Sequence, residues 1–194
     1  MPAIKAVTVF GGAASGSDPI FRETATALGR GLAEAGITVI FGGGSIGMMG
    51  AVADGALAAG GDVIGIIPDF LARREVAHTS VTEMIVTDSM HSRKRRMFEM
   101  SDGFVTLPGG LGTLDETFEM ITWRQLDLHA KPILICDVMG WGQHFRRMVE
   151  GYIEMGFVPP RAHDWFEILE SAEAIVRRLS ELPVIETATP VSRL

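Results

Sequence analysis

A glycine turn followed by two carboxylates is the part of the sequence whose residue types could carry out chemistry. The turn, residues 108–112 (PGGLG), joins an apolar segment to a helical pattern that opens near Thr113. Backbone N–H groups at such a junction can point at an anion, and the helix dipole favours negative charge there. Asp115 and Glu116 follow within the first turn of that pattern. The sequence therefore predicts a nucleotide site with its phosphate at the glycine turn.

The stretch from Thr113 to Glu116 also fits a purely structural role. It reads as a capping box, in which the Thr113 hydroxyl and the Glu116 carboxylate each satisfy a backbone N–H at the helix start. Such a cap contributes about 1 kcal/mol to stability without any function. The spacing alone leaves both interpretations of Glu116 open.

A basic segment lies shortly before the turn. Residues 93–96 (RKRR) are consecutive cations, and most charge runs of this kind are solvated. Met97 and Met100 nevertheless indicate that one side of this helix packs inward. We then expect Arg93 to point towards the glycine turn and Arg95 to face water. Arginine suits phosphate and ribose recognition because its donors form a rigid fork.

A second glycine loop, residues 42–47 (GGGSIG), matches the dinucleotide pattern G-x-G-x-x-G between a strand and a helix. A dinucleotide site also needs an acidic residue at the end of the next strand. Asp69 is the candidate, and it lies in an irregular segment. We therefore expect this loop to line the pocket, through Gly43 and Gly44, rather than to bind NAD.

Short apolar strands alternate with helical patterns along the chain. The strands are expected at residues 4–10, 37–41, 62–67, 81–87, 103–107 and 131–136, and the helices at 18–35, 48–60, from 90, from 113, at 141–155 and at 171–182. This alternation specifies a parallel sheet covered on both faces. The predicted fold class is α/β, a single doubly wound Rossmann-like domain with a mainly parallel sheet over residues 1–185, and residues 186–194 are expected to form a flexible tail.

Composition excludes several classes of function. A net charge of −7 argues against general nucleic-acid binding. Cys136 lies in an apolar run and is expected in the core, and the histidines lack metal-ligand spacing, so no metal and no cofactor are predicted. The chain opens on a strand pattern, and no apolar stretch approaches the ~18 residues of a membrane span. We expect a cytoplasmic protein without a membrane partner.

Two motifs together resemble a known family. Met90-His91-Ser92-Arg93-Lys94 is followed by Pro108-Gly109-Gly110-Leu111-Gly112-Thr113-Leu114-Asp115-Glu116. This pair looks like the signature of the LONELY GUY family, the cytokinin riboside 5′-monophosphate phosphoribohydrolases, which have often been labelled lysine decarboxylases. The resemblance extends over most of the chain and includes FGGGSIGMMGAVADGA, GIIPDFL and ITWRQLDLHAKPI.

The resemblance implies hydrolysis of the N-glycosidic bond of an N6-substituted AMP, or of AMP itself, to free base and ribose 5-phosphate. It implies a catalytic pair, Arg93 and Glu116, no cofactor, and a homodimer. The residues expected to line the nucleotide site are Glu75, Arg93, Lys94, Gly109, Gly110, Leu111, Gly112, Thr113, Leu114, Asp115, Glu116 and Thr122.

One loop departs from the family pattern, and other functions stay open. Family members usually carry a Cys-Gly-Ser-Ser type loop after the first strand, whereas residues 11–15 here are GGAAS. Hydroxyl contacts from this loop would have to come from Ser15 or Ser17. A nucleotide-binding or carrier protein with the same pocket and no turnover is the alternative. Lysine decarboxylation would need a pyridoxal-phosphate lysine, and neither Lys94 nor Lys131 has a recognisable context for one.

Overall fold

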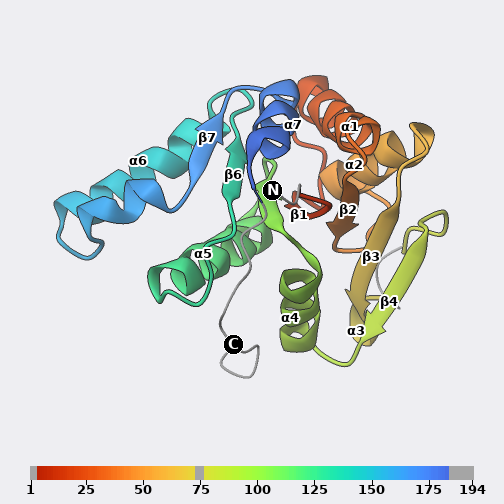
Figure 1. Ribbon diagram of the computed structural model, residues 1–194, viewed down its shortest axis with the longest axis horizontal. Coiled ribbons are helices and arrows are strands. Elements are labelled where there is room, and N and C mark those ends of the chain that lie inside the picture. Colours follow the sequence, from red (N-terminus) through yellow and green to blue (C-terminus); the bar gives the residue numbers. More distant parts are fainter. Residues whose placement is uncertain (1–3, 73–76, 184–194) are drawn as a thin grey trace.

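The computed structural model describes residues 4–72 and 77–183. The predicted tail at residues 186–194 and the predicted site residue Glu75 both lie outside the described residues. The described chain forms a seven-stranded sheet with the strand order β4-β3-β2-β1-β5-β6-β7 (Figure 1). Every neighbouring pair of strands is parallel. The prediction of a doubly wound α/β fold is therefore confirmed.

The bounds of the elements follow the predicted alternation closely. The strands are β1 (Ala6–Phe10), β2 (Thr38–Phe41), β3 (Val63–Pro68), β4 (Glu83–Thr87), β5 (Gly103–Thr106), β6 (Ile133–Cys136) and β7 (Glu167–Leu169). The helices are α1 (Pro19–Glu34), α2 (Gly47–Ala58), α3 (Asp69–Ala72), α4 (Met90–Met100), α5 (Leu111–Gln125), α6 (Trp141–Glu154), the 3-10 helix η1 (Pro160–Asp164) and α7 (Ala172–Glu181). The sequence does not predict α3, η1 or β7, because each is too short to show a hydrophobic period.

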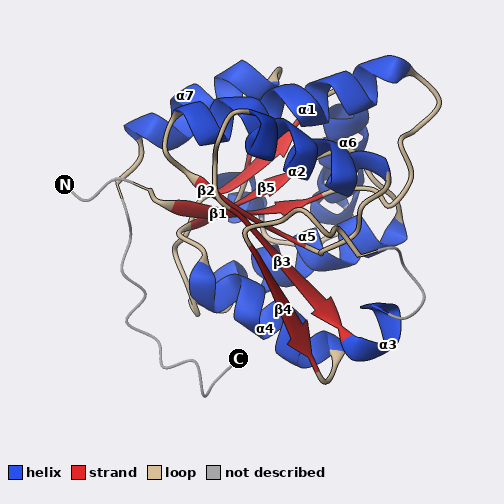
Figure 2. Cartoon of the chain, turned by 90° about the vertical axis from the view of Figure 1, so that its right-hand side faces the viewer, coloured by secondary structure: helices blue, strands red, loops and turns tan. Residues whose placement is uncertain are grey.

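Alternate residues of the strands face two separate cores. Val7 and Val9 of β1 pack with α1, α2 and α7, whereas Phe10 of the same strand packs with α4, α5 and α6. Figure 2 shows α1, α2 and α7 on one side of the sheet and α4 and α5 on the other. A parallel sheet buried on both faces explains why its strands read as continuous apolar runs. Cys136 belongs to the first core, as predicted, and burial raises the pKa of its thiol to about 12.

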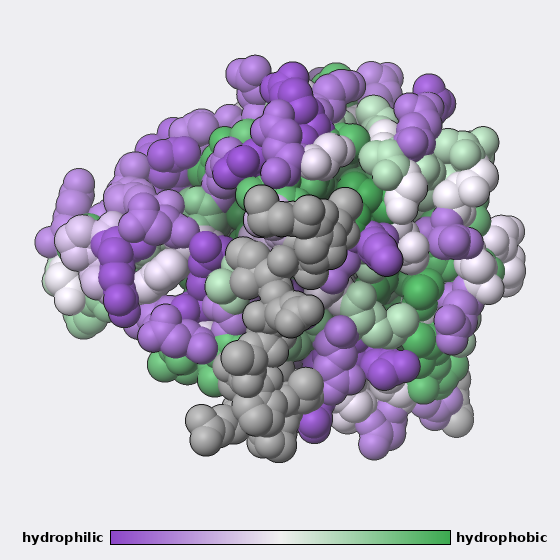
Figure 3. Space-filling model, viewed as in Figure 1, coloured by the Kyte–Doolittle hydropathy of each residue, from purple (hydrophilic) through white to green (hydrophobic). Residues whose placement is uncertain are grey.

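The surface of the described residues has a hydrophobic area. Hydrophobic residues gather at the right-hand side of Figure 3, where Figure 1 shows β3 and β4. Phe70 of α3 and Val86 of β4 are exposed. Elsewhere this face is largely hydrophilic. No helix in residues 4–72 and 77–183 is long and apolar enough to cross a membrane.

Helices α1 and α2 cross in direct backbone contact at two glycines. A Cβ atom at Gly29 would lie 2.0 Å from the carbonyl oxygen of Val52, and one at Gly55 would lie 2.2 Å from that of Thr26. Such distances exclude a side chain at either position. Because α1 and α2 follow β1 and β2, this crossing holds the loops at the carboxyl ends of those strands in place.

We expect Gly29→Ala to lower the free energy of unfolding by about 2–3 kcal/mol, because the new methyl group forces the two helices apart. Gly151 is the matched control, since a Cβ atom there meets nothing within 4 Å. Gly151→Ala is expected to stabilise the protein by about 0.5–1 kcal/mol through helix propensity alone. Urea unfolding measures both variants. Equal effects of the two substitutions would show that the crossing tolerates a side chain.

Candidate active site

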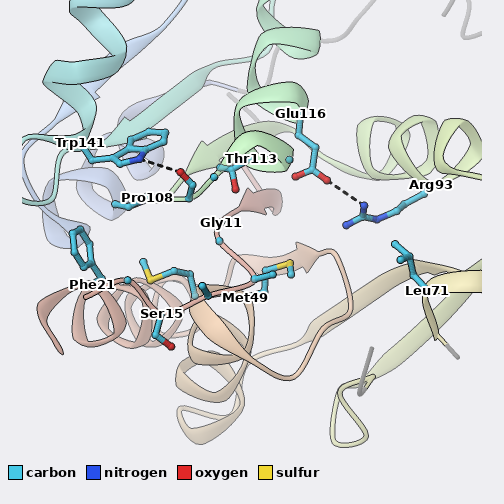
Figure 4. A pocket seen from close by; sticks show the side chains of 18 residues that line it. Gly11, Ser15, Phe21, Met49, Leu71, Arg93, Pro108, Thr113, Glu116 and Trp141 are labelled. Carbon is cyan, nitrogen blue, oxygen red and sulfur yellow. Dashed lines mark hydrogen bonds and ion pairs between the residues drawn. The ribbon is translucent and has the colours of Figure 1, made fainter. Parts of the chain in front are cut away.

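The site lies where the strand order reverses. β1 occupies the middle of the sheet, between β2 and β5, and ligands of doubly wound sheets bind at the carboxyl ends of strands at such a point. A cavity of about 490 Å³ opens there (Figure 4). Its walls come from the loop at residues 11–16 after β1, the glycine turn after β5, and the helices that follow.

Helix α5 begins earlier than the sequence predicts. Its first residue is Leu111 and its N-cap is Gly110, which offers no side-chain cap. Thr113 lies inside the first turn and is buried, so the predicted capping box from Thr113 to Glu116 is wrong. Glycine brings the backbone close to the cavity, and the uncapped N–H groups of the first turn form an anion site with the helix dipole.

Hydrogen bonds on the other side of the turn fix its orientation. Trp141 Nε1 donates to the carbonyl of Gly109 at 3.2 Å (Figure 4), and Gly12 N donates to the carbonyl of Pro108 at 3.1 Å. The Thr117 hydroxyl donates to the carbonyl of Thr113 at 2.7 Å. These bonds occupy carbonyl groups of the turn and of α5, and they leave the N–H groups at the helix start for a ligand.

Arg93 and Glu116 form a buried ion pair in the cavity wall. Arg93 Nη1 lies 3.2 Å from Glu116 Oε1, and the two side chains are only 9% and 12% exposed. Arg93 Nε also donates to the carbonyl of Ile66 at 3.1 Å, which fixes the guanidinium. A Cβ atom at Gly42 would lie 2.2 Å from Arg93 Nη2, so this glycine makes room for the arginine.

The environment of Glu116 disfavours its charged form. Burial raises the pKa of its carboxyl above the ordinary value of 4.5, and the Arg93 charge opposes that shift. Asp115 and Glu119 raise this pKa further, and Lys94 lowers it. A carboxyl whose pKa is raised in a cavity is suited to take up and release a proton near neutral pH.

The basic helix is oriented as predicted. Arg93 is buried and faces the cavity, whereas the Arg95 side chain is 40% exposed and pairs with Glu99 on its own helix. Met97 is fully buried on the inner side. The positions of Met97 and Met100 in the sequence therefore predicted correctly that the Arg93 side chain points inward.

The structure brings part of the predicted site together. The predicted residues that line the cavity are Arg93, Gly109, Gly110, Gly112, Thr113 and Glu116. Ser15 also lines it, whereas Ser17 is not among the lining residues.

Other predicted residues lie outside the cavity wall. Leu111 is 86% exposed, Leu114 packs against the second core, and Thr122 is exposed further along α5. Lys94 Nζ faces Asp115 and Glu119 of α5. Their roles in substrate binding stay predictions.

The second glycine loop does not reach the cavity through the predicted residues. Gly43 has a φ of +80° and packs beside Ile67 and Met84, and Gly44 forms a bridge with Ala77. Its neighbour Gly42 contacts Arg93 instead. The loop therefore supports the site from behind.

The sequence did not predict that apolar side chains form part of the cavity wall. These side chains are those of Phe21, Met48, Met49, Leu71 and Trp141. Met48 also belongs to the first core. These residues come from four helices, α1, α2, α3 and α6, so no local pattern could have grouped them. Within the described chain, no group of three His, Cys, Asp or Glu residues could hold a metal ion.

Comparison with known proteins connects this geometry to a family. A family model described as "Possible lysine decarboxylase" matches residues 49–179. The chain is 41% identical over 175 residues to a "Probable cytokinin riboside 5'-monophosphate phosphoribohydrolase" of Oryza sativa subsp. japonica, covering 90% of this chain and 77% of that protein. It is 38% identical over 180 residues to a protein of Rhodococcoides fascians named for the same activity, covering 90% and 89%.

Solved structures show the same fold in more distant proteins. The molybdenum cofactor binding protein from Rippkaea orientalis has a TM-score of 0.68 at 22% identity, covering 90% of this chain and 94% of that one. The molybdenum cofactor carrier protein from Chlamydomonas reinhardtii has a TM-score of 0.66 at 20% identity, covering 90% and 97%. Identities this low show the fold alone. The family match and the closer relatives, by contrast, extend over most of the chain, and the protein therefore belongs to the LONELY GUY family.

Proposed function

We propose that the protein hydrolyses the N-glycosidic bond of AMP and N6-substituted AMP, releasing the free base and ribose 5-phosphate. The observation that carries the proposal is the buried pair of Arg93 and Glu116, which lies in the wall of the same cavity as the uncapped start of α5. Relatives at 38% and 41% identity are named for this reaction on cytokinin riboside 5′-monophosphates.

The start of α5 supports binding of the 5′-phosphate. Gly110 and Gly112 leave the backbone open on the cavity side, and a Cβ atom at either position would meet nothing within 4 Å. Backbone N–H groups and the helix dipole then stabilise the dianion. Thr113 lines the same part of the cavity and offers a hydroxyl.

Glu116 is in position to act on the ribose. It lies one helical turn beyond the phosphate site on α5, so a bound ribose 5-phosphate places C1′ near its carboxylate. Glu116 accepts a proton from water, the water oxygen bonds to C1′, and the electrons of the C1′–N9 bond move to the purine. The proton taken up by Glu116 then passes to the departing purine, which leaves as neutral base and returns Glu116 to its carboxylate form. The carboxylate also stabilises the positive charge that develops on the ribose. Arg93 holds Glu116 in place, and its charge opposes the rise in the Glu116 pKa that burial causes.

The apolar wall supports a purine with an apolar N6 substituent. Phe21, Met49, Leu71 and Trp141 enclose part of the cavity with side chains that bind flat or aliphatic groups (Figure 4). A methionine adapts its shape to differing substituents because it is unbranched. The homodimer implied by the family resemblance stays a prediction.

The first test compares release of free base from AMP and from isopentenyladenosine monophosphate by wild type and Glu116→Gln. We expect wild type to release base from both, and Glu116→Gln to lose about 10²–10⁴-fold in kcat, because an amide cannot accept the proton from water. The ratio of kcat/KM for the two substrates measures what the apolar wall contributes. Chromatography of the released base gives the rates.

Glu99→Gln is the control for this test, because Glu99 is an exposed carboxylate of α4. Its activity should equal that of wild type. Wild type that binds AMP and releases no base would establish the carrier alternative. Release that survives Glu116→Gln would keep the hydrolase and remove Glu116 from its mechanism.

The pH dependence of kcat/KM tests the role of Arg93. Glu116 works in its ionised form, so activity is present above its raised pKa and falls as the pH is lowered through that value. Arg93→Met removes the charge that lowers this pKa, so the acid limb should move to higher pH. Arg93→Lys, which keeps the charge, should move it less. An acid limb that stays in place in Arg93→Met would mean that another group titrates.

Trp141 provides a test of the glycine turn. Trp141→Phe keeps an aromatic ring in the cavity wall and removes the hydrogen bond to the carbonyl of Gly109. We expect KM for AMP to rise about fivefold, the value of one hydrogen bond of about 1 kcal/mol, because the turn loses its fixed orientation. Trp165→Phe is the control, because Trp165 is not among the residues that line the cavity. An unchanged KM in Trp141→Phe would show that the turn is held without this bond.

A further inference from the structure

Lys94 has a different environment from that of Arg93, its neighbour on α4. Its Nζ atom lies 3.2 Å from Asp115 Oδ2 and 3.1 Å from Glu119 Oε2, both on α5. The Lys94 side chain is only 17% exposed, and it is not part of the cavity wall. Lys94 therefore joins the two helices that carry the catalytic pair, next to that pair.

The carboxylates that Lys94 contacts need a counter-charge. Asp115 and Glu119 are four residues apart on α5, and like charges at this spacing repel each other. Glu119 Oε2 is buried and accepts no well-formed hydrogen bond from residues 4–72 and 77–183. The Lys94 ammonium lies 3.1 Å from this oxygen and forms an ion pair with it. The ammonium charge is therefore what offsets the burial of this oxygen.

We propose that Lys94 is a positioning residue: by bridging Asp115 and Glu119, it holds α5 against α4 so that Glu116 stays in contact with Arg93. This inference rests on the proposed hydrolase reaction. It assigns Lys94 to the support of Glu116 instead of the binding of substrate. Arg93–Glu116 and Lys94–Asp115/Glu119 then form two adjacent cross-links between the same pair of helices.

The same arrangement controls the charge around Glu116. Of the groups that face it, Arg93 and Lys94 on α4 favour its ionised form, and Asp115 and Glu119 on α5 disfavour it. β1, β5 and the loop at residues 11–16 contribute no titratable side chain. Without Lys94, two carboxylates next to Glu116 would lose their counter-charge. The acid limb of the pH profile would then move to higher pH, which a merely structural contact would not cause.

The test uses Lys94→Met, Lys94→Arg and the double variant Lys94→Met/Glu119→Gln. We expect Lys94→Met to lower kcat about tenfold to a hundredfold with little change in KM for AMP, because Glu116 is displaced relative to the ribose. Lys94→Arg, which keeps the charge, should retain most of kcat. The double variant should regain at least part of the lost kcat, because the buried oxygen of Glu119 no longer carries a charge. Arg95→Met is the matched control, since it removes a cation from the outer side of α4.

The measured kcat and KM distinguish a positioning role of Lys94 from substrate binding and from no role at all. A rise in KM for AMP with kcat retained would make Lys94 a substrate ligand and overturn the proposal. The proposal would also be overturned if the double variant had as low a kcat as Lys94→Met. The same holds if Lys94→Met had the same kcat and pH profile as Arg95→Met. ¹³C NMR titration of the Glu116 carboxyl reports its pKa without turnover. If wild type releases no base, the proposed function fails, while this titration still decides whether Lys94 acts on Glu116. Should Lys94→Met not fold, Lys94→Arg and Glu119→Gln carry the comparison.

Discussion

The ion pair between Arg93 and Glu116 is the interaction on which the rest of the site depends. Two opposite charges buried from water stabilise little by themselves, because their desolvation offsets their attraction. They must be held in one geometry by their surroundings. The carbonyl of Ile66 accepts from Arg93, and α4 and α5 are packed on the same face of the sheet. Burial of the pair therefore raises the pKa of the Glu116 carboxyl, which makes this group suited to exchange a proton.

The second constraint is that the backbone must approach neighbouring groups closely at several positions, which only glycine permits. Gly42 leaves space for the Arg93 guanidinium, and Gly109 lies against the Thr113 hydroxyl, where a Cβ atom would come within 2.1 Å of its oxygen. Farther from the cavity, Gly29 and Gly55 let α1 and α2 touch. α1 follows the loop that lines the cavity and α2 follows the second glycine loop, so packing far from the cavity determines where both loops lie. A side chain at any of these positions would act on the site through the backbone.

The sequence predicted the fold and the direction of Arg93, because both depend on local periodicity. Apolar runs alternate with helical patterns throughout, and Met97 marks the inner side of α4. The start of α5 was mispredicted since Thr113 and Glu116 fit a capping box, whereas the helix in fact begins at Leu111. The apolar wall could not be predicted at all. Phe21, Leu71 and Trp141 are brought together only by the order of the strands.

The two glycine loops differ in whether their helix is open to a ligand. At the start of α2, the N–H groups of Met48 and Met49 donate to the carbonyl of Gly12, at 2.9 and 3.4 Å. The loop after β1 therefore satisfies the N-terminus of α2, and the pattern G-x-G-x-x-G serves packing. At α5, no loop carbonyl of the described residues accepts from the N–H groups of the first turn, which open on the cavity instead. The loop at residues 11–15 departs from the Cys-Gly-Ser-Ser pattern and keeps one hydroxyl, at Ser15, yet it still supports the site because its backbone holds α2 and the glycine turn together.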